Sequence, residues 1–295
     1  MSSLDDLSRD LAALVERAGK GVVRVSARRG RPATGIAWAE DLVLTADHAV
    51  EQESGITVST GTAEVTATIA GRDPGTDLAL LRTDRSAATV LARGKGADLR
   101  VGHLVMAIGR PRDIQATLGI VSALGGSFRN WRGGDDEGLI HTNAELLTGF
   151  SGGPLLDSGG TVVGINSWNY GRGASRALPV ETAEQVVKAL LQHGRIRRAY
   201  LGLGTQPIRL AAPAGALAGQ DGGLLVVAVD PGGPAASAGV MQGDVVLAVS
   251  GIAAQRLDDM FGALHRLEVG AVAGLRLLRA GEVRDLTVTT GERSG

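Results

Sequence analysis

Three residues in separate segments are of the types that nucleophilic catalysis requires. His48 follows the strand-like run 42–45, Asp77 opens the apolar run 78–81, and Ser151 lies within Gly-Phe-Ser-Gly-Gly-Pro. A serine hydroxyl is a weak nucleophile, so it needs a base that takes its proton. An imidazole can be that base, and a carboxylate beside it holds the tautomer and stabilises the imidazolium. The three types predict a site in which Ser151 is the nucleophile, His48 the base and Asp77 its orienting group.

Each of these residues also has an ordinary interpretation when it is taken alone. A Ser-Gly-Gly tripeptide is more often a turn, and a single histidine is more often structural. The ordinary interpretation of Asp77 is a turn or a cap, a role that suits Asp73 well. Chemistry is favoured because all three types occur in one β-rich segment, in the order His, Asp, Ser. Three other histidines have no such context, namely His103, His193 and His265. His141, at the end of an apolar run, is ambiguous.

The glycines around Ser151 suit a loop that binds a developing oxyanion. Stabilising that charge requires backbone N–H groups that converge on one point. Gly149 lets the loop turn so that its own N–H and that of Ser151 share one hole, and Gly152 and Gly153 keep side chains away from the substrate. We therefore expect an oxyanion hole formed by Gly149, Phe150 and Ser151.

The elements that must position these residues are mostly strands. Between residue 22 and about residue 170, short runs rich in β-branched and aliphatic residues alternate with Gly, Asp, Pro and Ser clusters. This pattern is typical of an all-β barrel or sandwich. Apolar residues at helical spacing predict one helix over 3–17 and another over 181–193, which Gly194 ends. The predicted fold class is mainly β.

Four parts of the chain differ in composition and in predicted secondary structure. We expect a helical segment over 1–20, a first β-rich domain over 21–194, a linker over 195–199 and a second, smaller domain over 200–292. The second domain has predicted strands near 201–209, 223–229, 244–249, 274–279 and 284–289, and two predicted helices, at 235–239 and 257–267.

Composition excludes several other classes of protein. The chain has 295 residues, of which 44% are hydrophobic and 21% charged, so it can form packed domains. The net charge of −1 and the 3% aromatic content argue against binding to nucleic acid. Without cysteine, disulfides, Cys–zinc sites, iron–sulfur clusters and thiol catalysis are excluded. Neither a Walker A loop nor His-Glu-x-x-His occurs, and we expect no metal or other cofactor.

The chain contains no candidate membrane segment and no recognisable export signal. No run approaches the ~20 apolar residues of a membrane helix. The first residues, MSSLDDLSRD, are acidic and lead into no short apolar run with a cleavage site. The chain as written therefore predicts a cytoplasmic protein, although a processed form of an exported protein would read the same.

Around the three candidate residues the chain resembles the HtrA/DegP family of trypsin-like serine proteases, over about residues 20–290. The segments that carry this resemblance are 42–50, 72–81, 101–111, 119–123, 142–156 and 163–166. The resemblance implies a chymotrypsin-like double β-barrel followed by one PDZ domain. It also implies a serine endopeptidase that acts on unfolded or damaged protein, assembled as a homotrimer.

The resemblance assigns roles in the second domain as well. Tyr200, Leu201, Gly202 and Leu203 match the loop of PDZ domains that receives a peptide C-terminus on its N–H groups, while the peptide adds a strand to the sheet. The helix over 257–267 offers candidates for the side-chain pocket, with ordinary core packing as the alternative; these are Met260, Phe261 and Leu264.

The residues that would select the substrate side chain follow from the same resemblance. Glu145 lies six residues before Ser151, where trypsin-like folds place the base of the primary specificity pocket. A carboxylate there would favour Arg or Lys before the scissile bond. Alternatively, Glu145 turns outward or pairs with an arginine such as Arg172 or Arg176. The expected wall residues of the pocket are Ile165, Asn166 and Ser167.

The chain departs from the family pattern next to the candidate nucleophile. Leu-Thr-Gly-Phe at 147–150 stands where the family has Asn-Pro-Gly-Asn, so Phe150 is expected at the rim of the pocket. Residues 125–138 match the position of the family's regulatory loop. The competing interpretation is a catalytically silent peptide-binding or chaperone-like protein on the same scaffold, which the presence of all three candidate catalytic residues disfavours.

Overall fold

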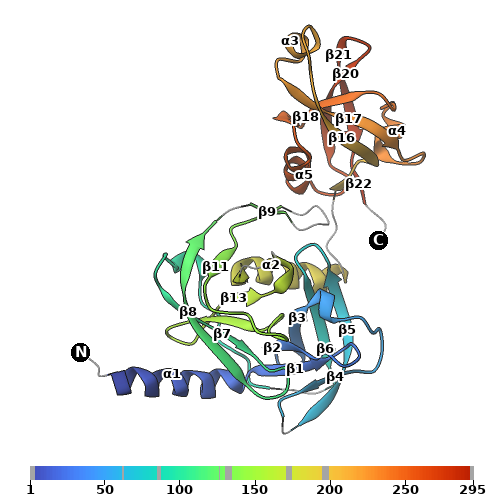
Figure 1. Cartoon of the computed structure of the whole chain (residues 1–295). Coiled ribbons are helices and arrows are strands. Elements are labelled where there is room, and N and C mark those ends of the chain that lie inside the picture. The colour runs from blue at the N-terminus through green and yellow to red at the C-terminus, as the bar shows by residue number, and fades with distance from the viewer. Residues whose placement is uncertain are drawn as a thin grey trace. The chain divides into compact units, whose positions relative to one another are not determined.

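The chain forms two compact units, Met1–Ile196 and Arg197–Gly295 (Figure 1). The computed structural model describes residues 4–61, 63–84, 88–125, 127–129, 135–170, 175–194 and 199–292. Of the expected linker over 195–199, residues 195–198 lie outside this described part of the chain.

The first unit contains two closed antiparallel β-barrels, and the expectation of a double barrel is confirmed. The first barrel has the order β1-β2-β3-β6-β5-β4. Its strands are β1 (Val22–Ser26), β2 (Ala33–Ala39), β3 (Leu42–Ala46), β4 (Ile56–Ser59), β5 (Glu64–Asp73) and β6 (Leu78–Thr83). The second barrel has the order β11-β14-β13-β12-β7-β8. Its strands are β7 (Leu104–Gly109), β8 (Gln115–Leu124), β11 (Ile140–Thr142), β12 (Pro154–Asp157), β13 (Val162–Asn166) and β14 (Ser175–Pro179).

The apolar core of this unit lies inside each barrel and in the seam between the barrels. Along β3, Leu42 and Leu44 pack with residues of the second barrel, whereas Val43 packs inside the first. Successive side chains of a strand point to opposite faces, so β3 is buried along its whole length. This double burial explains why the run reads as continuously apolar instead of alternating.

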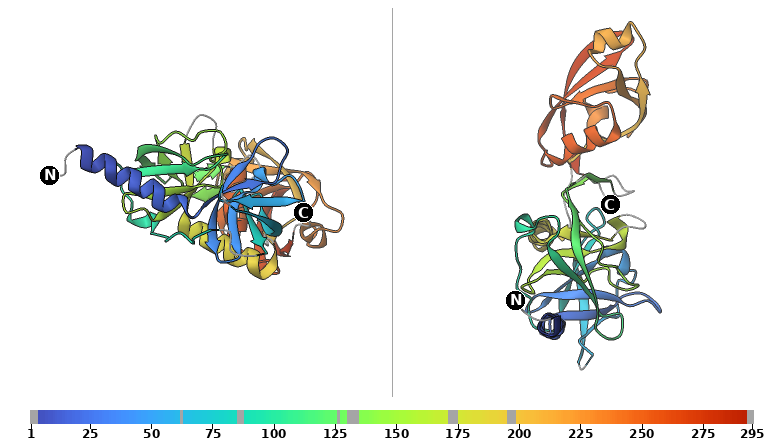
Figure 2. Two further views of the ribbon diagram at one scale, coloured as in Figure 1. Left: turned by 90° about the horizontal axis from the view of Figure 1, so that it is seen from below. Right: turned by 60° about the vertical axis from the view of Figure 1, so that its left-hand side comes forward.

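Helices and short turns complete the first unit. In α1 (Leu4–Gly19) Leu14 and Ala18 pack into the seam, whereas the N-terminal half extends past the barrels and leaves Leu4 86% exposed (Figures 1 and 2). Helix α2 (Val180–His193) ends at Gly194, which adopts a φ of +70° and donates to the Leu190 carbonyl. Both helix predictions are confirmed. The smaller elements are the hairpin β9 (Ser127–Arg129) and β10 (Asp135–Glu137), and the 3₁₀ turns η1 (Asp47–Ala49), η2 (Gly96–Asp98) and η3 (Trp168–Tyr170).

The second unit is a twisted antiparallel sheet in the order β16-β17-β18-β20-β21, with helices packed against it. Its strands are β15 (Ala199–Tyr200), β16 (Leu203–Arg209), β17 (Gly222–Val229), β18 (Val245–Val249), β19 (Ile252–Ala253), β20 (Val272–Arg279), β21 (Glu282–Thr289) and β22 (Gly291–Glu292). Its helices are α3 (Ala214–Ala218), α4 (Pro234–Ser237) and α5 (Leu257–His265). The two predicted helices are confirmed as α4 and α5. Helix α3 is an additional element of 5 residues, too short to produce a helical period in the sequence. No helix in the described ranges is long and apolar enough to cross a membrane.

Candidate active site

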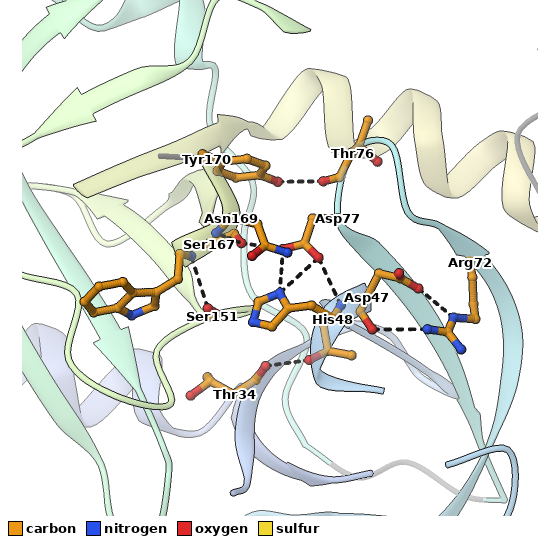
Figure 3. Close-up of polar contacts among 12 residues, drawn as sticks. Thr34, Asp47, His48, Arg72, Thr76, Asp77, Ser151, Ser167, Asn169 and Tyr170 are labelled. Atoms are coloured by element: carbon orange, nitrogen blue, oxygen red, sulfur yellow. Dashed lines mark hydrogen bonds and ion pairs between the residues drawn. The ribbon is translucent and has the colours of Figure 1, made fainter. Parts of the chain in front are cut away.

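The end of β3 and the turn η1 place His48 beside Asp77 (Figure 3). Nδ1 of His48 lies 2.8 Å from Oδ2 and 3.0 Å from Oδ1 of Asp77. The backbone N–H of His48 donates to the same carboxylate, at 3.0 Å from Oδ1. A carboxylate at Nδ1 holds the proton on that nitrogen, so Nε2 is left to accept one. The structure thus brings these two predicted residues together in the geometry of a base and its orienting group.

Asp77 adopts a left-handed backbone conformation with a φ of +54°, which is uncommon for a residue with a side chain. Its surroundings hold it there. The hydroxyl of Tyr170 donates to the Thr76 carbonyl at 2.7 Å. The Asp73 carboxylate accepts the N–H and the hydroxyl of Thr76 at 3.1 and 2.7 Å. Asp73 therefore forms the turn, whereas Asp77 contacts His48, which is the division of roles that the sequence favours.

Ser167 supplies a further hydrogen bond to the Asp77 carboxylate. Its hydroxyl donates to Oδ2, and both residues are buried, Asp77 being only 5% exposed. Hydrogen bonds to an ionised carboxylate are stronger than those between neutral groups and fix its orientation. We expected Ser167 in the wall of the specificity pocket, but its hydroxyl instead contacts Asp77.

Ser151 lies in the loop before β12 and contacts the turn η3. Its Oγ accepts the backbone N–H of Trp168 at 3.2 Å, and the residue is 3% exposed. In this conformation no hydrogen bond joins Ser151 to His48 among the contacts of the described residues (Figure 3). Ser167 and Trp168 are consecutive in the chain. Ser167 contacts Asp77, and Trp168 contacts Ser151. For proton transfer the hydroxyl must turn toward Nε2, and such bonds often form only with substrate bound.

In the loop before Ser151, two of the three N–H groups expected to form an oxyanion hole have no acceptor among the described residues. Gly149 adopts a φ of +90°, and neither its N–H nor that of Ser151 donates to a described residue. The N–H of Phe150 instead donates to the Leu147 carbonyl at 3.0 Å, so it is not available to a substrate. The two available donors are those of Gly149 and Ser151.

The Phe150 side chain is fully buried in the second barrel and does not lie at a pocket rim. It packs against Gly109, where a Cβ would come within 2.3 Å of the ring. The neighbouring glycines also serve packing. A Cβ on Gly152 would lie 2.2 Å from the Thr34 carbonyl oxygen. These glycines therefore let the loop approach the barrel backbone, a reason different from the clearance for substrate that we expected.

Glu145 is exposed, and its side chain forms no ion pair with another described residue. Its backbone carbonyl accepts the hydroxyl of Thr117 at 2.7 Å, which anchors the segment to β8. Arg176 donates to the Tyr170 carbonyl, and Arg172 lies outside the described residues.

The remaining predicted wall residues are internal to the fold. Ile165 is fully buried in the seam between the barrels, and Asn166 is fully buried with its Nδ2 donating to the Pro154 carbonyl at 2.8 Å. Neither side chain lines an open pocket. This corrects the expectation, and the reason is that β13 is covered on both of its faces.

In the second unit, hydrogen bonds hold the segment before β16, where the sequence predicts a carboxylate-binding loop. The carbonyls of Leu201 and Gly202 accept N–H groups of Ala235 and Asp230 at 2.8 and 2.9 Å. The hydroxyl of Tyr200 donates to Asp230 at 2.8 Å. The N–H groups of Leu201 and Gly202 donate to none of the described residues. This arrangement leaves two donors for an anionic group.

The predicted pocket residues of the second unit lie on α5, next to β16. β16 begins at Leu203 and is an edge strand of the sheet, and α5 contacts it. Met260 and Leu264 are buried in the core of the unit, which is the alternative that the sequence left open. Phe261 is only partly buried. Of the three predicted pocket residues, Phe261 is therefore the one with surface left for a ligand.

Comparisons with known proteins agree with both units. The model of the trypsin-like peptidase domain matches residues 33–165, and that of the PDZ domain matches residues 199–290. A probable periplasmic DegP-like serine endoprotease of Pseudomonas fluorescens is 35% identical over 269 residues, which cover 86% of this chain and 54% of that protein. The HtrA-type protease AlgW, solved with a decapeptide, has a TM-score of 0.78 at 26% identity, covering 96% of this chain and 99% of that chain. This chain belongs to the HtrA/DegP-like family, with a trypsin-like peptidase domain followed by a C-terminal PDZ domain.

Other HtrA/DegP-like proteins give the same result. A serine endoprotease from Yersinia pestis has a TM-score of 0.76 at 27% identity, covering 96% of this chain and 98% of that chain. The chain spans about half the length of the curated relatives that it matches. It covers 54% of the Pseudomonas fluorescens protein and 54% of a similar protein from Halomonas elongata. The family resemblance seen in the sequence is confirmed.

Two residues at this site, Trp168 and Tyr170, had no signal in the sequence that singled them out. Both come from η3, which follows the predicted strand over 161–165 but has no regular period of its own.

Among the described residues, no group of three or more His, Asp or Glu side chains could hold a metal ion.

Proposed function

We propose that this chain is a serine endopeptidase that cleaves unfolded or damaged proteins. The observation that supports it best is the 2.8 Å contact between His48 Nδ1 and Asp77, together with the consecutive residues Ser167 and Trp168 that contact Asp77 and Ser151. This arrangement combines a base, its orienting carboxylate and a serine hydroxyl with two unused N–H donors. Those are the parts that acyl transfer from a peptide bond requires.

The proposed reaction proceeds in two stages. Ser151 Oγ attacks the scissile carbonyl carbon, and its proton passes to Nε2 of His48. The N–H groups of Gly149 and Ser151 donate to the carbonyl oxygen as it becomes negative. The C–N bond breaks as the imidazolium gives its proton to the leaving amine. Water, deprotonated by His48, then hydrolyses the ester on Ser151 and restores the enzyme.

Labelling with a fluorophosphonate probe tests the nucleophile. We expect the parent protein to form a covalent adduct and Ser151→Ala to form none. Cleavage of an unfolded protein such as casein should fall by several orders of magnitude in this variant. Ser122→Ala, at an exposed serine of β8, is the matched control and should react like the parent. Equal labelling of Ser151→Ala and the parent would disprove the assignment.

One observation favours a second candidate function, a catalytically silent peptide-binding protein. The Oγ of Ser151 accepts the N–H of Trp168 and is not hydrogen-bonded to His48 in this conformation. If that hydroxyl never reaches His48, the parent protein will bind unfolded polypeptide but will neither react with the probe nor cleave. The labelling experiment separates the two functions.

We further propose that the loop over 200–203 binds peptide C-termini, so that a peptide adds a strand to β16. Calorimetry compares an apolar peptide that has a free carboxylate with the same peptide amidated at its C-terminus. The free acid should bind at least about tenfold more tightly, because an amide lacks the charge that the two N–H groups accept. Equal affinities would exclude carboxylate capture.

The cellular compartment stays a prediction from the sequence. The curated relatives are named periplasmic, which supports an exported protein over the cytoplasmic location that the sequence predicts.

A further inference from the structure

Thr34 lies near the start of β2 and is fully buried where the first barrel meets the candidate nucleophile loop. Its hydroxyl donates to the Gly149 carbonyl at 2.6 Å and accepts the backbone N–H of Arg110 at 2.8 Å. One side chain of the first barrel thus bonds both to the loop that carries Ser151 and to the residue that follows β7.

The backbone of Thr34 makes two further contacts in the same region. Its N–H donates to the Ser151 carbonyl at 3.2 Å. Its carbonyl accepts the hydroxyl of Thr45 at 2.7 Å, which is the dashed contact beside Thr34 in Figure 3. Thr45 lies in β3, three residues before His48. Thr34 therefore connects the strand that leads to the candidate base with the loop that carries the candidate nucleophile.

The bond to Gly149 acts on a single peptide plane. That plane contains the Gly149 carbonyl, held by Thr34 at 2.6 Å, and the Phe150 N–H, held by the Leu147 carbonyl at 3.0 Å. It is therefore fixed at both of its polar ends. Glycine rotates easily about φ and ψ, so without such bonds a plane beside Gly149 would adopt several orientations. The N–H groups on either side of the fixed plane are those of Gly149 and Ser151.

We propose that Thr34 is a positioning residue for the oxyanion hole of this chain, an inference that rests on the proposed endopeptidase function. By holding the Gly149 carbonyl, the Thr34 hydroxyl keeps the N–H groups of Gly149 and Ser151 directed at one point. These donors stabilise a transition state only if they are aimed before the reaction begins. The Thr34 hydroxyl bonds to the Gly149 carbonyl and the Arg110 N–H and to none of Ser151 Oγ, His48 and Asp77, so it acts through Gly149.

Thr34→Val tests this role, because it replaces the hydroxyl by a methyl group of similar size. We expect kcat for a peptide substrate, and the rate of fluorophosphonate labelling, to fall about 10- to 100-fold, less than the loss of an oxyanion donor itself. KM should change little, because the donors act on the transition state. Thr34→Ser keeps the hydroxyl and should stay within about threefold of the parent.

Thr142→Val is the matched control for loss of a buried hydroxyl. Thr142 is also buried. Its hydroxyl donates to the Ile120 carbonyl at 2.8 Å and accepts the N–H of Ala144 at 3.0 Å, so it makes the same two kinds of hydrogen bond as Thr34. It makes no bond to the loop over 147–151. Thr142→Val should lower the melting temperature much as Thr34→Val does, but it should leave kcat per titrated active site near that of the parent.

The outcomes separate this inference from the proposed function. A parent protein that fails to react with the probe overturns both. A reactive parent together with a Thr34→Val variant of unchanged kcat per active site overturns the role of Thr34 alone. So does an equal loss of kcat in Thr34→Val and Thr142→Val, because that would be a general effect of stability. If circular dichroism shows that Thr34→Val does not fold, Thr34→Ala is measured in its place against the same control.

Discussion

Asp47, the residue before His48, is a buried carboxylate that depends on a single arginine. Nε of Arg72 donates to Asp47 Oδ1 at 2.6 Å, and Nη2 of Arg72 lies 3.3 Å from the Asp47 carbonyl oxygen (Figure 3). Arg72 belongs to β5, so this ion pair ties the turn that carries His48 to a neighbouring strand. Burying a carboxylate without a cation is costly, so the arginine compensates for the burial of Asp47.

Arg72→Met should therefore lower the free energy of unfolding by about 3 kcal/mol, because it leaves Asp47 buried without its cation. Chemical denaturation followed by circular dichroism measures this loss. Arg82→Met is the control, since the Arg82–Asp41 pair is exposed on both sides and should contribute less than about 1 kcal/mol. Adding Asp47→Asn to Arg72→Met should restore part of the loss. Equal losses in the Arg72 and Arg82 variants would contradict this account.

Glu145 offers a test of substrate preference. Its side chain is exposed and has no ion-pair partner among the described residues, which favours the outward alternative over a carboxylate at the base of a pocket. We expect cleavage of a peptide library after small aliphatic residues such as Val, Ala or Leu. We also expect the same profile from Glu145→Ala, since an exposed carboxylate contributes little selective binding. A preference for Arg or Lys that disappears in Glu145→Ala would assign the pocket base to this residue.

In the PDZ unit, the turn before β18 depends on one buried charge. Asp244 is 2% exposed and accepts Nε and Nη2 of Arg279, in β20, at 2.6 and 2.7 Å. It also accepts the N–H of Met241 at 2.8 Å. Burial by itself would raise the pKa of Asp244, but the hydrogen bonds from Arg279 and Met241 outweigh it and hold that pKa below its usual value. The ionised carboxylate thus stabilises this corner of the sheet.

The direction of this shift predicts a pH dependence. Because the pKa of Asp244 is lower in the folded than in the unfolded chain, its stabilising effect is fully present above the unfolded value of about 3.9 and is lost as the pH falls through the folded value. Asp244→Asn should destabilise the PDZ unit by about 3 kcal/mol at pH 7, and by much less in acid, where the parent carboxyl is protonated.

Calorimetry of both proteins at pH 7 and in acid measures the difference. Glu282→Gln is the control, since the Glu282–Arg284 pair of the same sheet is exposed. A loss from Asp244→Asn that does not depend on pH would show that the charge of Asp244 does not stabilise the unit.

The chain consists of two units, each of which has apolar clusters of its own. The family resemblance predicts a homotrimer. The exposed N-terminal half of α1 leaves the apolar residues Leu4 and Leu7 uncovered in a single copy. We therefore expect light scattering after size-exclusion chromatography to give the mass of three chains. A concentration-independent mass of one chain would disprove the trimer.

The sequence alone determined the fold class, the two helices of the first unit and the three candidate catalytic residues. These depend on short-range information. His48, Asp77 and Ser151 each stand in a local motif beside an apolar strand, and their order along the chain restricts the fold that can bring them together. Gly149 and Gly194 both adopt a positive φ, a local conformation that favours glycine. Their turns could therefore be predicted without knowledge of any tertiary contact.

The tertiary structure alone decided which side chains surround those residues. Ile165, Asn166 and Ser167 follow one another in a segment buried on every side, so no alternation in the sequence distinguishes the core from a pocket or from Asp77. Phe150 belongs to the barrel interior for the same reason. Thr34 and Gly149 are 115 positions apart, and closure of two barrels against each other makes their hydrogen bond. Such contacts depend on how sheets pack, and packing of distant segments has no local pattern that a sequence could display.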